Sequence, residues 1–277
     1  MTAEPSVFRR AAHYVRLTFL DFVDVLLRRR DPLTPSRRAA EYVGGSDFAE
    51  IGRHLAEVAT ALGEMKPTDT ILDAGCGYGR LAVALARRSR PGSYLGFDIS
   101  RDAIQWCREH IQPRFPNFQF RHADVRNTHY NVRGRIEAEA FPFPAPSSSI
   151  DVVFAASLFT HLQREAVANY LRESSRVLKD GGRFVASFFI LNAESLPRVR
   201  GGKTEPPLTI VDADVAVQSL TDPEKAIAFS EEWLRSAIQN AGLQIVAIHP
   251  GAWRSRQGLS YQDFVVAVKG SRASATT

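Results

Sequence analysis

The sequence predicts an α/β fold with a mostly parallel sheet and helices on both of its faces. Short apolar runs alternate with helical patterns from about residue 70 to residue 190, which is typical of parallel strands joined by helical crossovers. A glycine-rich turn connects the first apolar run to a helical pattern, as in sites that bind nucleotide cofactors. The composition is that of an ordinary globular protein, with 44% hydrophobic and 23% charged residues.

The glycine-rich turn reads Asp73-Ala74-Gly75-Cys76-Gly77-Tyr78-Gly79-Arg80 and follows the apolar residues Ile71 and Leu72. Its glycines fall at every second position, whereas the dinucleotide fingerprint G-x-G-x-x-G would need glycine where Arg80 stands. The carboxylate of Asp73 would repel two phosphates but would suit a cationic amino group. The turn therefore disfavours a dinucleotide as the cofactor.

Acidic residues also end the next two predicted strands. The run from Ser93 to Ser100 contains Asp98, which lies about 20 residues beyond the glycines, the spacing expected of a carboxylate that accepts ribose hydroxyls. The run from Phe118 to Val125 contains Asp124. Two more runs, Ser149–Ser157 and Val177–Phe188, predict a fourth strand and a helix end followed by a fifth strand.

In this order and spacing, the segment from about Thr70 to Phe189 resembles the class I S-adenosylmethionine-dependent methyltransferases, whose first motif has the form D-x-G-x-G-x-G. The resemblance implies a Rossmann-like, mostly parallel seven-stranded sheet. It also implies that Leu243–Ile248 and Tyr261–Lys269 form an antiparallel C-terminal hairpin, and that Asp124 accepts a hydrogen bond from the adenine amino group. S-adenosyl-L-methionine is the implied cofactor. The residues expected to bind it are Asp73, Ala74, Gly75, Cys76, Gly77, Gly79, Arg80, Asp98, Ile99, Asp124, Val125 and Ala156.

Three regions are expected along the chain: an N-terminal helical cap at 1–65, the methyltransferase domain at 66–270, and a frayed tail at 271–277. Apolar residues at three- and four-residue steps predict a helix over Val7–Arg30, ended by Asp31-Pro32 and carrying Arg28-Arg29-Arg30 at its C-terminus. This helix is either a cap packed on the domain or over the cofactor, or a contact with a membrane surface or a second copy. A second helix is expected from Asp47 to Gly63, after a glycine-bearing turn at 42–46. The family often folds a segment at that place over the methionine end of the cofactor.

Two irregular stretches interrupt the alternation, at 126–148 and 191–225. Both follow strand ends on the carboxyl side of the sheet, where open α/β folds bind ligands. They are interpreted as inserted loops, and the second is favoured as a lid over the site, with a decorated surface loop as the alternative.

His161 is the candidate catalytic residue. It lies directly after the fourth predicted strand, beside the expected place of the transferring methyl group, and a histidine near its usual pKa of about 6.5 can remove a proton at neutral pH. The alternative is a histidine that caps the helix from Gln163 or lines the cleft. Thr160 is the candidate cap of that helix, and His129 and His249 are weaker candidates for contact with substrate.

Other site types have less support. The two cysteines, Cys76 and Cys107, form no disulfide framework, which fits a reducing cytoplasm, and Cys76 is interpreted as a small filler of the glycine loop. No metal-ligand spacing, signal peptide or membrane-spanning run is expected. The net charge of +5 is attributed to basic side chains on a solvent-exposed surface, so no nucleic acid partner is expected.

The sequence therefore predicts a cytoplasmic enzyme that transfers a methyl group in line to a hydroxyl of a small molecule, such as a sugar or a secondary metabolite. Two alternatives remain: a membrane-associated methyltransferase of a lipid-linked glycan, using the basic N-terminal helix, and a non-catalytic cofactor-binding subunit. A homo-oligomer is also compatible with the N-terminal helix.

Overall fold

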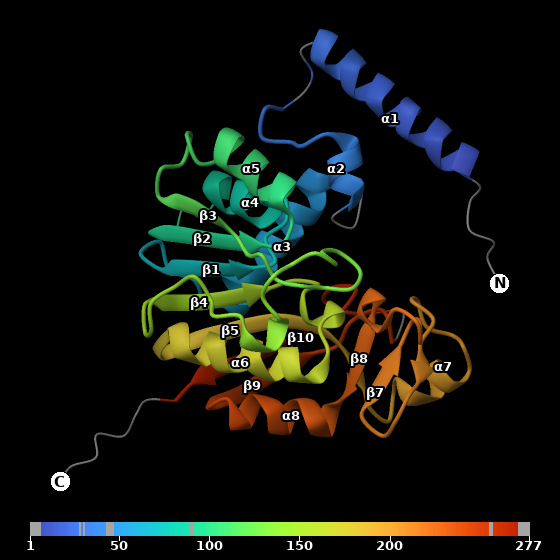
Figure 1. Ribbon diagram of the computed structural model, residues 1–277. Coiled ribbons are helices and arrows are strands. Elements are labelled where there is room, and N and C mark those ends of the chain that lie inside the picture. The colour runs from blue at the N-terminus through green and yellow to red at the C-terminus, as the bar shows by residue number, and fades with distance from the viewer. Residues whose placement is uncertain are drawn as a thin grey trace.

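The computed structural model describes residues 7–27, 29, 31–42, 47–88, 91–254 and 257–270 (Figure 1). The predicted arginine positions 28 and 30, most of the predicted turn at 42–46, and the tail at 271–277 lie outside these residues.

Helices occupy the positions that the sequence patterns predict, with small changes at their ends. The first helix ends at Leu26 rather than at Arg30, and Asp47 caps α3 by accepting a hydrogen bond from the Glu50 backbone N–H at 2.8 Å. The α-helices are α1 (Val7–Leu26), α2 (Arg37–Tyr42), α3 (Phe48–Leu62), α4 (Arg80–Arg88), α5 (Arg101–His110), α6 (Arg164–Val177), α7 (Leu196–Arg200) and α8 (Glu231–Asn240), and the 3₁₀ turns are η1 (Ala138–Ala140), η2 (Phe159–His161) and η3 (Pro223–Lys225).

Strands alternate with these helices from residue 70 onwards. They are β1 (Thr70–Ala74), β2 (Ser93–Asp98), β3 (Phe118–His122), β4 (Ile150–Ala155), β5 (Leu178–Leu191), β6 (Thr209–Ile210), β7 (Val215–Val217), β8 (Ile227–Ser230), β9 (Leu243–His249) and β10 (Asp263–Lys269). Strands β3, β2, β1, β4 and β5 are parallel neighbours in that order. Strand β10 pairs antiparallel with β5 and with β9, which confirms the α/β fold with an antiparallel C-terminal hairpin.

Strand β5 is long, and two successive segments of it pair with two different strands. Its residues 183–188 pair with β10, and its residues 189–191 pair in parallel with β8. Strand β8 continues antiparallel to β7, and β7 to β6, so the sheet contains ten strands in all. The stretch 191–225 thus includes α7 and two short strands, which extend the seven-stranded core at the carboxyl end of β5.

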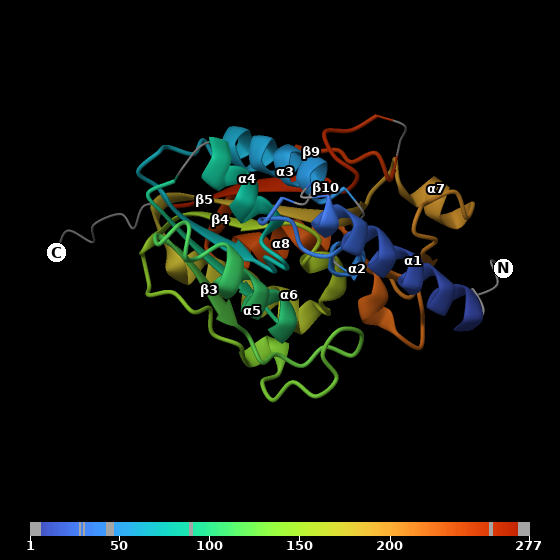
Figure 2. The ribbon, with the colours of Figure 1, turned by 90° about the horizontal axis from the view of Figure 1, so that it is seen from above.

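Alternation along each strand sends side chains to two separate cores (Figure 2). On one face, Ile71 of β1 and Phe154 of β4 pack with residues of α3, α4 and α5. On the other face, Leu72 and Val153 pack with residues of α6 and α8. Helices therefore cover both faces, as the near-continuous apolar strands require.

The stretch 126–148 contributes to the second core. Phe141 and Phe143 are buried, and Phe143 meets Phe97 at 4.9 Å and Tyr170 at 5.1 Å between ring centroids. The amide of Asn169 on α6 donates to the backbone carbonyls of Ala138 and Phe141 at 2.9 Å each. The later half of this stretch is consequently packed structure that joins β2 to α6.

Asp263 at the start of β10 anchors the loop before it to the end of β5. Its carboxylate is fully buried and accepts hydrogen bonds from the backbone N–H groups of Gly251 at 2.7 Å and Ile190 at 3.0 Å, and from Trp253 Nε1 at 2.7 Å. Arg254 Nε lies 3.0 Å from the Asp263 Oδ1 atom as an ion pair without good hydrogen-bond alignment, and Arg254 is only 6% exposed.

Replacing Asp263 with alanine should lower the free energy of unfolding by about 3–5 kcal/mol, because three buried donors lose their acceptor and buried Arg254 keeps only the exposed Glu194, at 3.6 Å, as a counter-charge. Chemical denaturation of the two proteins measures the difference. The matched control is Glu57→Ala, which breaks the solvent-exposed Glu57–Arg88 pair and should change little. Equal losses in the two variants would contradict the anchoring role.

Candidate functional site

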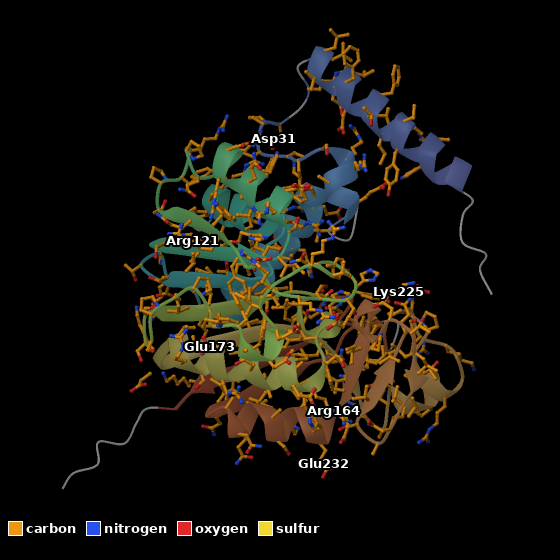
Figure 3. All side chains as sticks on the ribbon, in the orientation of Figure 1. Asp31, Arg121, Arg164, Glu173, Lys225 and Glu232 are labelled. Carbon is orange, nitrogen blue, oxygen red and sulfur yellow. The ribbon has the colours of Figure 1, made fainter. Side chains whose placement is uncertain are left out.

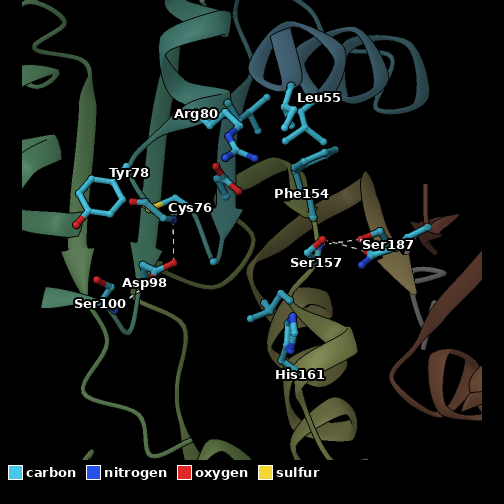
Figure 4. Close-up of a pocket in the computed structure, with 18 of the residues that line it drawn as sticks. Leu55, Cys76, Tyr78, Arg80, Asp98, Ser100, Phe154, Ser157, His161 and Ser187 are labelled. Atoms are coloured by element: carbon cyan, nitrogen blue, oxygen red, sulfur yellow. Dashed lines mark hydrogen bonds between the residues drawn. The ribbon is translucent and has the colours of Figure 1, made fainter. Parts of the chain in front are cut away.

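A cavity of about 970 Å³ opens at the carboxyl ends of β1, β2 and β4 (Figure 4). This is the side of an open α/β sheet on which ligands bind. Its walls come from the glycine loop, from α3, from the start of the first irregular stretch, from η2 and from the loop before β10. Predicted residues that line the cavity are Asp73, Gly75, Cys76, Gly77, Arg80, Asp98, Ile99, Val125, Ala156 and His161.

The glycine loop is fixed to the end of β2 by backbone hydrogen bonds. The N–H groups of Gly75 and Cys76 both donate to the Phe97 carbonyl, at 2.9 and 3.0 Å. Gly75 has a φ of +79°, a conformation that costs glycine little. A Cβ at Gly79 would lie 2.4 Å from Ile111 Cδ1, so the third glycine allows α4 to pack against α5. The loop therefore needs glycine for its shape and for its packing.

Asp98 closes the loop from the other side. Its Oδ2 accepts a hydrogen bond from Gly77 N–H at 2.8 Å, and its Oδ1 accepts one from Ser100 N–H at 2.7 Å. Burial raises the pKa of this carboxyl, while the backbone hydrogen bonds oppose that shift. Each oxygen keeps a further lone pair, so the carboxylate can still accept hydroxyl donors from a ligand in the cavity.

Asp73 lies deeper in the same wall and is 4% exposed. Burial, together with the neighbouring charge of Asp98, raises the pKa of Asp73 to about 7, although a 2.5 Å hydrogen bond from the Tyr94 hydroxyl opposes the shift. Two carboxyl groups that share one pocket disfavour each other's ionised form. A ligand cation placed there would relieve this repulsion.

Arg80 begins α4 and brings a guanidinium to the cavity wall (Figure 4). Its guanidinium carbon lies 5.6 Å from the centre of the Phe48 ring, and burial lowers its pKa. Cys76 is also buried, its thiol pKa is raised by burial, and a Cβ at Gly96 would lie 2.8 Å from its sulfur. Cys76 thus fills a tight gap as a protonated thiol.

Three predicted cofactor residues do not line the cavity: Ala74, Gly79 and Asp124. The Oδ2 atom of Asp124 accepts a 2.6 Å hydrogen bond from Arg135 Nε, and the expected contact of Asp124 with the adenine stays a prediction. The chain doubles back here, since the Asp124 carbonyl accepts from the N–H groups of Arg135 and Ile136. Ala74 instead packs in the core, and Gly79 packs against α5.

His161 lies on η2 directly after β4, and its ring is held in one orientation. The Nδ1 atom is 2.9 Å from the Glu224 backbone carbonyl, which can only accept, so Nδ1 carries the proton. Burial lowers the pKa of His161 below its usual value, although the Glu224 carbonyl opposes that shift. At neutral pH the ring is therefore uncharged, and Nε2 has a lone pair available.

Thr160 is not the cap of the following helix. Helix α6 begins after Gln163, whose side chain makes no capping hydrogen bond, and the Thr160 hydroxyl is buried without a hydrogen-bond partner among the residues described. The backbone bends between Thr160 and α6 because Leu162 is extended, which places the threonine inside the fold.

The start of the first irregular stretch meets the end of the second beside His161. The Glu224 carboxylate, 6% exposed, accepts hydrogen bonds from the backbone N–H of Thr128 at 2.5 Å and from its hydroxyl at 2.6 Å. His129 Nδ1 lies 2.6 Å from Asp222, and the Tyr130 ring stands edge-on to His161 at 5.2 Å between centroids. Tyr130 lines the cavity. These contacts join residues almost a hundred positions apart, so no local pattern could have found them.

A second polar group lies across the cavity, between the end of β4 and a residue within β5 (Figure 4). Ser157 has a φ of +55°, and its N–H donates to the Ser187 hydroxyl at 2.7 Å. The hydroxyls of Ser187 and Ser157 donate in turn to Gln262 Oε1, at 2.6 and 3.1 Å. All three residues line the cavity, and sequence patterns did not single them out, because Gln262 lies on the distant loop before β10.

Neither a metal centre nor a membrane span emerges from the part of the chain that the structure describes. Within it, no cluster of three or more histidine, cysteine or acidic side chains is arranged to hold a metal ion. None of the helices described is long and apolar enough to cross a bilayer.

Comparison with known proteins agrees with the geometry. Residues 71–182 match the model of a methyltransferase domain. The fatty-acid O-methyltransferase of Mycolicibacterium smegmatis is 32% identical over 117 residues, which are 42% of this chain and 35% of that protein. The phthiotriol/phenolphthiotriol dimycocerosates methyltransferase of Mycobacterium tuberculosis is 33% identical over 117 residues, 41% of this chain and 35% of that protein. The match thus spans about a third of the length of these relatives.

Solved structures share the fold at low sequence identity. A chain of the complex between the Haloferax volcanii Trm112 methyltransferase activator and a methyltransferase superposes with a TM-score of 0.58 at 17% identity, over 86% of this chain and 100% of that chain. Geranyl diphosphate C-methyltransferase from Streptomyces coelicolor, solved with S-adenosyl-L-homocysteine, gives a TM-score of 0.50 at 16% identity, over 77% and 79% of the two chains. The chain thus contains a methyltransferase domain at residues 71–182, and its sheet order and glycine loop are those of the class I S-adenosylmethionine-dependent methyltransferase fold.

Proposed function

We propose that this chain is an S-adenosylmethionine-dependent O-methyltransferase that acts on a hydroxyl of a small molecule, with His161 as the general base. The observation that carries the proposal is the neutral His161 ring, whose Nδ1 is engaged by the Glu224 carbonyl while Nε2 remains free to accept a proton. A sugar or a secondary metabolite supplies such a hydroxyl.

The polar groups around the glycine loop match the parts of the cofactor. Asp98 is proposed to accept the ribose hydroxyls, and Asp73 to face the cationic amino group, whose charge offsets the repulsion between the two carboxyls. Arg80 is proposed to meet the carboxylate of the methionine portion. Ile99 and Val125 offer apolar walls for the adenine.

The bound cofactor supplies an activated methyl group on a sulfonium, so the residues of the chain mainly align the acceptor. Holding two reactants in line can contribute roughly 7–11 kcal/mol to lowering the barrier. His161 would take the hydroxyl proton on Nε2 as the oxygen attacks the methyl carbon, and would keep its Nδ1 proton on Glu224. A base of this kind typically contributes a factor of about 10²–10⁴ in rate.

The far end of the cavity favours an acceptor with an apolar body. Ile51 and Leu55 of α3, Leu158 and Leu162 around η2, and Phe264 line it beside the Ser157–Ser187–Gln262 group. A sugar would place its polar hydroxyls against these apolar side chains, whereas a lipid-like secondary metabolite would cover them with apolar surface. The relatives named for fatty acids and for phthiotriol dimycocerosates also support an apolar acceptor.

Asp98→Ala should weaken S-adenosylmethionine binding roughly ten- to a hundredfold, because a hydrogen bond to a charged group is worth about 1.5–3 kcal/mol. Isothermal titration calorimetry measures the change. Asp180→Ala serves as the matched control and should bind close to wild type, since Asp180 is exposed near the start of β5, at the end of the sheet opposite the cavity. A normal affinity in Asp98→Ala would show that the ribose lies elsewhere.

Cofactor affinity should depend on the ionisation of Asp73. Because its pKa is raised to about 7, the carboxylate that attracts the amino group becomes populated only as pH rises towards 7. The affinity for the cofactor is therefore expected to increase from pH 5.5 to 7.5. Over this range the amino group of the cofactor stays largely protonated, because an α-amino group has a pKa of about 7.7–8.0. Asp73→Asn should bind more weakly at pH 7.5 and lose most of this slope. A parallel slope in the variant would assign the titration to another group.

His161→Ala should lower kcat by about 10²-fold or more and leave cofactor affinity almost unchanged. The pKa of His161 is lowered, so the wild-type rate should stay level near pH 7 and fall only below about pH 6.5, as the ring gains a proton. A screen of hydroxyl acceptors coupled to S-adenosylhomocysteine release supplies the assay. His110→Ala, outside the cavity, is the control.

Near-normal turnover in a folded His161→Ala protein would place the base elsewhere or indicate a nucleophile that needs none. Cofactor binding without turnover on any acceptor would favour the non-catalytic subunit instead.

A further inference from the structure

Helix α1 presents an apolar face that is exposed in the described structure, although the Arg38 guanidinium lies over the Tyr14 ring. Tyr14, Val15, Phe19, Phe22, Val25 and Leu26 are 40–69% exposed. At 3.6 residues per turn, these six side chains lie within an arc of about 140° along one side of the helix. A surface helix of a globular protein normally turns this side towards the core.

The side of α1 that faces the protein is largely polar. Asp24 Oδ2 lies 2.5 Å from Arg37 Nη1, and Asp21 accepts a hydrogen bond from the Arg37 backbone N–H at 3.0 Å. His13 Nε2 lies 2.9 Å from Glu41 Oε2. Leu17 is the buried apolar residue between them, at 7% exposed. The helix is thus held on its own domain mainly by ion pairs and hydrogen bonds, and its apolar side is exposed. Helix α1 lies at the edge of the molecule, with side chains projecting from it into open space (Figures 1 and 3).

The charge of the segment that carries this face indicates which kind of partner surface can bind to it. From Val7 to Tyr42 the chain has eight arginines and four acidic residues. The four acids, Asp21, Asp24, Asp31 and Glu41, all have basic partners within the domain. Arg16 and Arg29 are exposed at the edge and the end of the helix. This excess of positive charge repels a second copy of the same surface and attracts an anionic one.

We propose that α1 docks the protein on an anionic lipid bilayer, with the apolar face inserted at the level of the headgroups and the arginines against lipid phosphates. An amphipathic helix with aromatic and aliphatic residues on one side and arginines beside them has the properties of an interfacial helix. The His13–Glu41 pair connects α1 to a residue that lines the cavity, so the bilayer would lie on the side of the protein where the acceptor enters.

Co-sedimentation of the full chain with vesicles tests this docking without requiring methyl transfer. The protein should pellet with vesicles of phosphatidylcholine and phosphatidylglycerol, bind less to phosphatidylcholine alone, and release as salt is raised. The double substitution Phe19→Ser and Phe22→Ser should lower the partition coefficient at least about tenfold, because two aromatic side chains no longer enter the bilayer. Arg16→Glu should reduce the preference for anionic vesicles.

The matched control is the double substitution Leu220→Ser and Val246→Ser. These residues are 68% and 53% exposed on the body of the protein, and their loss should leave vesicle binding unchanged. Circular dichroism and cofactor titration confirm that each variant is folded. Equal binding by the Phe19/Phe22 variant and wild type, or no vesicle binding at all, would overturn the proposal. A dimer that the Phe19/Phe22 substitutions dissociate would assign the face to a second copy and would also overturn it.

Discussion

The attachment of the glycine loop to the end of β2 is the constraint on which the rest of the site depends. The Phe97 carbonyl accepts hydrogen bonds from two backbone N–H groups of the loop, and the Asp98 carboxylate accepts a third from Gly77 N–H. These bonds hold the loop open above the sheet and set the point at which α4 begins. Asp73, Asp98 and Arg80 reach one cavity wall because the same short turn connects β1 to α4 and is tied to β2.

The charge in this wall is arranged for a zwitterionic ligand. Two carboxyl groups with raised pKa values stand near each other, and a guanidinium with a lowered pKa stands at the start of α4. Burial disfavours the charged form of each of these three groups, and a ligand group of opposite charge would stabilise that form. The domain therefore holds an electrostatic preference for the cofactor at some cost to its own stability.

The two irregular stretches give this family fold its individual site. The second stretch contains β6 and β7, which join the sheet through β8 beside the end of β5, and it returns Glu224 to the beginning of the first stretch. The carbonyl of the same residue fixes the proton on His161. The carboxylate of Glu224 thus binds the first stretch at Thr128, and its backbone carbonyl binds His161. One residue of the second stretch therefore connects both stretches to the candidate base. The interpretation of the second stretch as a lid over the site stays a prediction, and the structure adds that it is packed against the sheet.

The sequence by itself determined the order of strands and helices, the cofactor class and most of the cofactor wall. Those features depend on local patterns: apolar runs, glycines at fixed steps and an acid at a strand end, as at Asp73 and Asp98. Tertiary structure alone decided where Asp124 points, because the chain reverses and brings Arg135 onto its carboxylate. It also decided the tautomer of His161, the Ser157–Ser187–Gln262 group and the outward apolar side of α1. Each of these depends on contacts between residues distant in the chain, and the periodicity of a segment tells which side is apolar but not what that side will meet.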